Sequence, residues 1–184
     1  MRRNAREAVF ILLYRDLFLT EKDESFIKKI YAENSLTAED EIFAGELYAT
    51  VKNNENEIAS IISTYSSGFD FTRLFLTDKC ALEIGVAELK YFGDVPEIVA
   101  IDEAVSLSRK FSADKSPSFV NGVLASYKKA LDESGAERCG KSSLTDVSVE
   151  KTAENTSEKI AEKPAEESIV SGGESDFAAE GEKE

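Results

Sequence analysis

The stretch from Val95 to Leu124, VPEIVAIDEAVSLSRKFSADKSPSFVNGVL, decides the fold of this chain. It contains two helical patterns joined by a short polar connection. Pro96 begins the first helix, because a proline at a helix start has no hydrogen bond to lose. Apolar residues then recur at spacings of three and four. Ser116 and Pro117 repeat the start signal, as a cap followed by a first residue. The stretch therefore predicts two consecutive amphipathic helices.

Five other segments show apolar residues at the same helical spacing. They lie at about residues 3–19, 24–33, 37–51, 56–65 and 78–92. Thr37 with Asp40 approximates a capping box at the start of the segment over 37–51. The segment over 78–92, capped by Thr77 and ended by Gly93, is apolar on nearly every side, so we expect it to be the central buried helix. Residues 71–76 are expected to form one short helical turn. With no strand-like alternation and no internal repeat, the sequence predicts an all-α fold of about seven helices.

Composition divides the chain near Gly135. Residues 1–135 hold 16 Lys+Arg and 23 Asp+Glu, a net charge of −7, together with 16 of the 17 aromatic residues. Residues 136–184 hold 6 and 13, again −7, in a much shorter stretch. Such a segment buries too little apolar surface to offset the cost of ordering its backbone, about 1–2 kcal/mol per residue. We therefore predict a helical domain over 1–135 and a disordered acidic tail over 136–184.

The residue inventory argues against several chemistries. There is no histidine, and the two cysteines, Cys80 and Cys139, form no CxxC motif, which excludes His-based catalysis and the common zinc sites. We expect no enzyme, no metal and no cofactor, with Cys80 as a small core residue. No run reaches the roughly 18 apolar residues that span a bilayer, and nothing resembles a signal peptide, so no membrane association and a cytoplasmic location are expected.

Three arginines, Arg2, Arg3 and Arg6, lie at the head of the first predicted helix. Positive charge there opposes the positive end of the helix dipole, at a cost of roughly a few tenths of a kcal/mol. Two interpretations are open. The arginines either belong to a solvated helix end or form a cluster that binds phosphate. The acidity of the whole chain argues against a non-specific nucleic-acid binder, but it allows a local basic patch.

A second candidate site lies where the two helices of the opening stretch meet. Lys110 and Lys115 give a local positive bias, and the helix start at Ser116 adds free N–H groups that can receive a phosphate. Phe111 and Phe119 are either core residues or rings on which RNA bases stack. Gly122 interrupts a good helix, from which we predict a close helix–helix approach.

Two sequence motifs resemble a known family. The N-terminal RRNAREAVFILLY, residues 2–14, is similar to the opening R-x-x-A-R-E-x-A…L-Y of the NusB family of transcription antitermination factors. The stretch from Val95 to Leu124 resembles the V-P…A-I-N-E-A-V-x-L-A-K-x-F…F-V-N-G-V-L signature of the same family, in the same order. Between them, Ala87-Glu88-Leu89 is similar to the end of an L-R-x-x-x-Y-E-L segment. The resemblance covers most of residues 1–131.

The resemblance implies a fold of two small helical bundles packed together. It also implies binding of the boxA element of ribosomal RNA transcripts jointly with NusE, a ribosomal protein. The function implied is assembly of an RNA polymerase antitermination complex that resists termination. By position, Arg2, Arg3 and Arg6 fall on the family's arginine-rich segment that contacts RNA.

Further residues take implied roles by position. Lys115 falls in a loop that also faces RNA, and Phe119 opens the F-V-N-G-V-L motif beside it. Phe111 or Phe119 is expected to offer a stacking surface. Asp78 matches an acidic position on the side that faces NusE. The resemblance thus divides the expected site between RNA and a protein partner.

The sequence departs from the family pattern at several positions. Asp102 replaces an asparagine, Glu83 stands where many members have arginine, and Ala87 replaces a usual tyrosine. The last two changes remove basic or aromatic character, which favours RNA binding that depends on the partner. Two alternatives are an accessory domain like the one fused to a ribosomal RNA methyltransferase, without catalysis of its own, and a helical bundle that binds only proteins.

Overall fold

The structure, a computed structural model, describes residues 2–19, 23–66 and 68–134. Over these ranges it consists of seven α-helices and one short 3-10 helix, with no strand, which confirms the predicted all-α class. The predicted acidic tail, residues 136–184, and the second cysteine, Cys139, lie outside the described residues.

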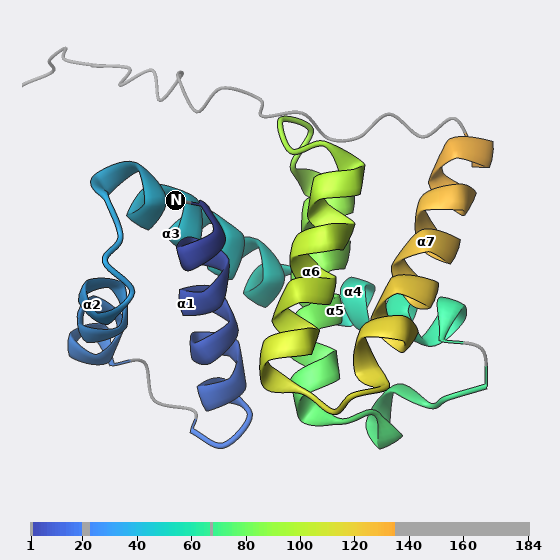
Figure 1. The fold of residues 1–184 in the computed structure, drawn as a ribbon, viewed down its shortest axis with the longest axis horizontal. Coiled ribbons are helices and arrows are strands. Elements are labelled where there is room, and N and C mark those ends of the chain that lie inside the picture. The colour runs from blue at the N-terminus through green and yellow to red at the C-terminus, as the bar shows by residue number, and fades with distance from the viewer. Residues whose placement is uncertain (1, 20–22, 67, 135–184) are drawn as a thin grey trace, which may run out of the picture. The chain divides into compact units, whose positions relative to one another are not determined.

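The first three helices form a small N-terminal bundle. They are α1 (Arg2–Asp16), α2 (Glu24–Glu33) and α3 (Ala38–Asn53). α1 packs against both α2 and α3, as Figure 1 shows. Ala8 and Leu12 of α1 bury their side chains against Ile30 of α2. The capping box predicted at Thr37 and Asp40 is present at the start of α3 and fixes where that helix begins.

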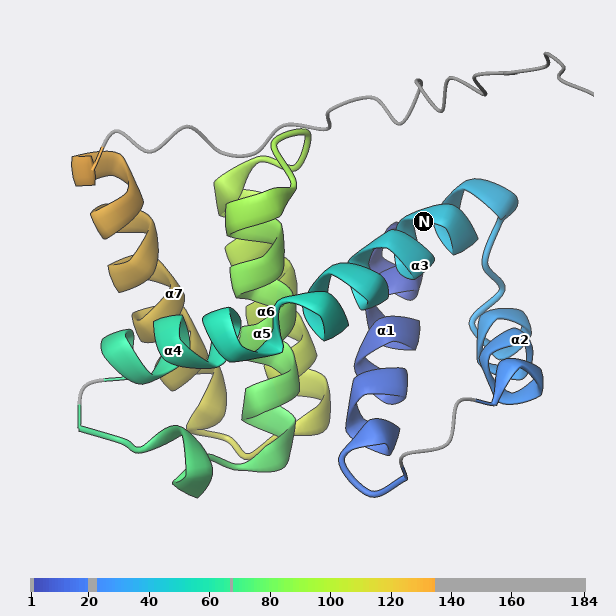
Figure 2. The same cartoon turned by 180° about the vertical axis from the view of Figure 1, so that it is seen from behind.

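The remaining helices form the C-terminal bundle. They are α4 (Glu55–Tyr65), α5 (Leu76–Tyr91), α6 (Glu97–Phe111) and α7 (Ser116–Ser134), with the 3-10 helix η1 (Phe71–Arg73) between α4 and α5. α5 packs against α4, α6 and α7, and it also contacts α1 and α3 of the first bundle. Figures 1 and 2 show α6 and α4 on opposite sides of α5. The expected arrangement of two packed bundles is confirmed.

The central position of α5 follows from its sequence. Ten of its sixteen residues are buried, because apolar side chains surround the helix on nearly every side. Cys80 is fully buried among them, as predicted, and this burial raises the pKa of its thiol. The start of the helix differs from the prediction. α5 begins at Leu76, and Thr77 is not the cap; its hydroxyl lies 2.9 Å from the Ser112 hydroxyl.

The glycine that permits a close helix approach is Gly85, and not Gly122 as the sequence suggested. A Cβ atom added at Gly85 would lie 2.6 Å from Leu124 Cδ1 and 3.1 Å from the Ala104 Cβ, so α5, α6 and α7 meet at this point. A Cβ atom at Gly122 would meet nothing within 4 Å. The prediction for Gly122 was wrong because a helical pattern shows that a glycine is present but not which face packs.

Candidate nucleic-acid interface

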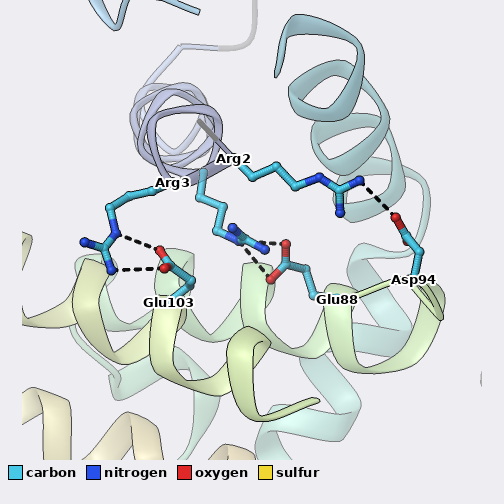
Figure 3. Close-up of polar contacts among 6 residues, drawn as sticks. Arg2, Arg3, Glu88, Asp94 and Glu103 are labelled. Atoms are coloured by element: carbon cyan, nitrogen blue, oxygen red, sulfur yellow. Dashed lines mark hydrogen bonds and ion pairs between the residues drawn. The ribbon is translucent and has the colours of Figure 1, made fainter. Parts of the chain in front are cut away.

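The three arginines at the start of α1, Arg2, Arg3 and Arg6, do not form one cluster. Figure 3 shows Arg2 and Arg3 extending to opposite sides of the helix, each toward a carboxylate of the C-terminal bundle. Arg2 lies 3.1 Å from Asp94, in the connection between α5 and α6. Arg3 donates two hydrogen bonds, of 3.1 and 3.0 Å, to Glu103 of α6. The arginine cluster expected from the sequence is thus divided among three partners.

Arg6, the third arginine, is a buried structural residue. Its Nε donates to both carboxylate oxygens of Glu88 on α5, at 2.8 and 3.0 Å. Only 3% of Arg6 and none of Glu88 is exposed. Burial raises the pKa of Glu88, while the Arg6 guanidinium acts in the opposite direction. This pair joins α1 to α5, and the expectation that Arg6 lies on an RNA-contacting surface is corrected, because the side chain does not reach the surface.

A cationic groove of about 350 Å³ lies between α1 and α6. Arg3, Arg109 and Lys110 line it together with Glu7 and Glu103, so three positive side chains face two negative ones. Lys110 lies 2.6 Å from Glu7, and Arg3 is held by Glu103. We name this cavity, defined by these five residues, the α1–α6 groove.

Arg109 is the residue of this groove that sequence reasoning missed. It is exposed, and its guanidinium has no ion-pair or hydrogen-bond partner within the described part of the chain. Its position beside Lys110 in the last turn of α6 was a weak signal, because cations are common at helix ends. Only the packing of α6 against α1 places it opposite Arg3.

A second, smaller cavity of about 230 Å³ lies where η1, α5 and α7 meet. It brings together the predicted Lys115 and Phe119 with Arg73, Phe69 and Phe75. Phe69 and Phe75 are 59% and 69% exposed, which is unusual for phenylalanine. Phe69 meets Phe119 edge to face, with ring centroids 5.6 Å apart. We name this cavity the aromatic pocket; exposed rings beside Arg73 and Lys115 suit bases and phosphates.

Phe111 lies apart from the aromatic pocket. Its ring stacks on Phe10 of α1, with centroids 4.5 Å apart and planes inclined by 15°. The Lys110 ammonium lies 5.2 Å from the Phe111 centroid. Phe111 is half-buried and links α6 to α1, so one ring face is already covered. As a stacking surface it is less suitable than Phe119.

Asp78 is buried, which corrects its predicted place on a partner-binding surface. It is 3% exposed, and its carboxylate accepts hydrogen bonds from Ser112 at 2.5 Å and from Ser116 at 2.9 Å. These bonds tie the start of α5 to the turn between α6 and α7. Asp78 therefore shapes the aromatic pocket by holding the turn that carries Lys115.

No group of three or more Cys, Asp and Glu side chains in the described residues is placed to hold a metal ion. Among the described helices, none has the length and apolar character that crossing a membrane requires.

Over the described residues, the protein consists of two small helical bundles joined through α5, and exposed cations lie along their junction. A sequence model of the NusB family matches residues 3–129. The match covers more than half of the chain, and the chain belongs to the NusB family.

Solved structures agree with this assignment. T. maritima NusB is 29% identical, with a TM-score of 0.62, and the match covers 70% of this chain and 91% of that one. NusB from Aquifex aeolicus, solved in solution, is 31% identical, with a TM-score of 0.61 and coverage of 78% and 97%. A chain from a crystal structure of the antitermination factors NusB and NusE in complex with double-stranded RNA is 30% identical, with a TM-score of 0.63 and coverage of 70% and 96%.

Proposed function

We propose that this protein is a transcription antitermination factor that binds boxA-type RNA of ribosomal RNA transcripts together with NusE, in the cytoplasm. The observation that carries the proposal is its similarity to a chain from a NusB–NusE–RNA complex, over 70% of its length. Assembly with an RNA polymerase antitermination complex is the corresponding role.

The proposed RNA surface runs from the α1–α6 groove to the aromatic pocket. Arg3, Arg109 and Lys110 supply phosphate contacts in the groove, and Lys115 supplies another beside the pocket. Phosphate contacts give affinity but carry no sequence information. Specificity therefore requires unstacked bases, and Phe119 with its neighbour Phe69 offers rings for them. Arg2 lies on the other side of α1, where a phosphate would have to displace Asp94.

Competition with carboxylates explains why a partner is needed. A phosphate that enters the α1–α6 groove must replace Glu103 on Arg3 or Glu7 on Lys110. Such exchange lowers the net gain per contact, so the protein alone should bind RNA weakly. We place NusE beside the aromatic pocket, where the exposed Phe75 remains available for a protein contact. RNA held by both proteins then binds more tightly than by either alone.

Fluorescence anisotropy with labelled boxA-type RNA, with and without NusE, tests the proposal. The double variant Arg109→Ala/Lys110→Ala should weaken RNA binding and reduce its dependence on salt. Each phosphate contact on a single strand contributes about 0.7 to the slope of log affinity against log salt, so the loss of two contacts should reduce that slope by about 1.4. The matched control is Lys28→Ala/Lys29→Ala, which removes the same charge from the exposed face of α2. Equal losses of RNA affinity in both variants would show that the groove contributes only through the general charge of the protein. An RNA affinity that does not change when NusE is added would contradict a site shared by the two proteins.

One observation favours a second function. Arg2, Arg3 and Arg6, at the start of α1, are all paired with carboxylates of the C-terminal bundle. A helical bundle that binds only proteins would show the same neutralisation. The same titration decides between the two, because such a bundle would bind NusE without any added affinity for RNA.

A further inference from the structure

A third groove opens on the opposite side of α1 from the α1–α6 groove. Its cavity, of about 440 Å³, lies between the last turn of α1, the α3–α4 junction, η1 and α5. Its charged lining consists of Asp16, Lys52, Glu55 and Glu83, and its apolar lining includes Leu17 and Phe71. We name it the acidic groove.

The two grooves on either side of α1 face different directions. Glu7 lines the α1–α6 groove and Asp16 lines the acidic groove. Nine residues separate them, which is about two and a half turns of an α-helix, so their side chains point to opposite sides. In Figure 1 α6 lies toward the viewer, and in Figure 2 α4 does. A ligand in the acidic groove would leave the α1–α6 groove uncovered.

The charges of the acidic groove are unbalanced. Among the side chains that line the groove, three carboxylates face one ammonium, that of Lys52, which pairs with Glu55 and lies 3.7 Å from Asp16. Asp16 also has a partner outside this lining, because its carboxylate lies 3.6 Å from the Arg15 guanidinium. The third carboxylate, Glu83, has no ion pair or hydrogen bond to its side chain within the described residues. A half-buried carboxylate without a cation is costly, since water no longer solvates it fully.

The apolar walls narrow the kind of cation that fits. Leu17 is 41% exposed, so an apolar surface lies open beside the carboxylates. The ring of Phe71 already attracts a cation, because the Lys79 ammonium lies 4.6 Å from its centroid. Arginine has the complementary form: its methylene stem covers apolar surface, and its planar guanidinium both pairs with carboxylates and stacks on rings. A small hydrated ion would leave Leu17 uncovered.

We propose that the acidic groove binds an arginine side chain from a basic segment of a partner protein, with Glu83 as the carboxylate that receives the guanidinium. Asp16 and Glu55 provide the surrounding negative potential, and Leu17 and Phe71 contact the stem. The site lies on the opposite side of α1 from the α1–α6 groove, so both grooves can be occupied together.

Binding should release a proton near neutral pH. Burial, with a smaller contribution from Glu55, raises the pKa of Glu83 to about 7, while Lys52 and Lys79 act in the opposite direction. Asp16 of α1 is the other acid that faces the groove. The guanidinium requires the ionised form of Glu83, which is the minor form at pH 6 and the major form at pH 8. Affinity should therefore rise about tenfold between these values.

The test uses the full chain and the peptide acetyl-Leu-Arg-Leu-Arg-Leu-amide as probe. The matched peptide carries citrulline, an uncharged isostere, in place of each arginine. Chemical shifts of the ¹⁵N-labelled protein locate the site, and fluorescence anisotropy of a labelled peptide measures affinity at pH 6 and 8. Glu83→Gln removes the carboxylate at nearly constant shape. Glu39→Gln, on the exposed first turn of α3, removes the same charge elsewhere.

The expected result is arginine-dependent binding with shifts around Asp16, Glu55 and Glu83. Glu83→Gln should weaken it about tenfold at pH 8 and make it independent of pH, while Glu39→Gln leaves both unchanged. The proposal is overturned if the citrulline peptide binds as tightly as the arginine peptide, or if Glu83→Gln and Glu39→Gln lose equal affinity for the arginine peptide. It is also overturned if the arginine peptide produces no chemical-shift changes in the groove. Spermidine binding there as tightly as the peptide would overturn the assignment to a protein segment.

Discussion

The two grooves beside α1 are built from the same pair of bundles, yet they carry opposite charge. In the α1–α6 groove, three cations outnumber two carboxylates, and Arg109 is unpaired within the described residues. In the acidic groove, three carboxylates outnumber one cation, and Glu83 is the unpaired group. Among the residues that line them, the α1–α6 groove has an excess of one positive charge and the acidic groove an excess of two negative charges. The difference indicates two ligands of opposite charge on opposite sides of one helix.

Between the grooves, the Arg6–Glu88 pair has a different role, because it is closed to solvent. Exposed pairs such as Arg3–Glu103 exchange readily with water and ligands, and they contribute little to stability. A buried pair must stay intact, since removing one partner leaves an uncompensated charge inside the protein. Burial therefore separates the structural arginine from the arginine available to a ligand.

The largest expected effect is on the stability that the buried Arg6–Glu88 pair contributes. Arg6→Ala should lower the free energy of unfolding by about 3–5 kcal/mol, because it leaves Glu88 buried without its cation. Urea denaturation followed by circular dichroism measures the change. The double variant Arg6→Met/Glu88→Leu should regain most of the loss, since no buried charge remains. A loss of less than about 1 kcal/mol for Arg6→Ala would show that the Arg6–Glu88 pair contributes no more to stability than an exposed ion pair does.

The next effect concerns the acidic groove. Since the pKa of Glu83 is about 7 in the fold, above its ordinary 4.5, the folded protein binds more protons than the unfolded chain between these values. Stability contributed by Glu83 therefore falls as pH rises from about 4.5 to 7. Glu83→Gln should raise the free energy of unfolding at pH 8 by up to about 3 kcal/mol and leave it nearly unchanged at pH 4. Urea denaturation at both pH values measures this difference, and a destabilised variant at pH 8 would contradict the unpaired carboxylate.

A smaller effect tests whether the two grooves act independently. Glu83→Gln should change the affinity for boxA-type RNA by less than about twofold, because sites without shared partners are additive to within about 0.5 kcal/mol. Arg109→Ala/Lys110→Ala should leave the affinity for the arginine peptide equally unaffected. Anisotropy titrations of both ligands with both variants give the comparison. Strong coupling in either direction would show that the grooves form one electrostatic unit.

The smallest effect is expected at Arg3. Arg3→Ala should cost less than about 1 kcal/mol of stability, because its side chain is 60% exposed and ion pairs of exposed side chains contribute little. The same variant should weaken RNA binding and lower its salt dependence. Urea denaturation and RNA titration on one preparation check both statements. A large loss of stability with unchanged RNA affinity would make Arg3 a structural residue like Arg6.

The sequence by itself determined the helices and their order. Local signals were sufficient: the segment predicted at 24–33 is α2, and the capping box at Thr37 starts α3 as expected. The apolar surroundings of α5 also identified the central helix and the burial of Cys80. These features depend on residues a few positions apart, which is the range over which periodicity and capping act.

Only the tertiary structure decided the roles of the charged residues. The partners of Arg2, Arg3 and Arg6 lie 82 to 100 positions away in the sequence, and no local pattern links them. Burial of Asp78, the unpaired state of Arg109 and the close approach at Gly85 are likewise set by which helix faces meet. The physical reason is common to all of them. A charge or a glycine gains its function from what packs against it, and that packing joins segments distant in the chain.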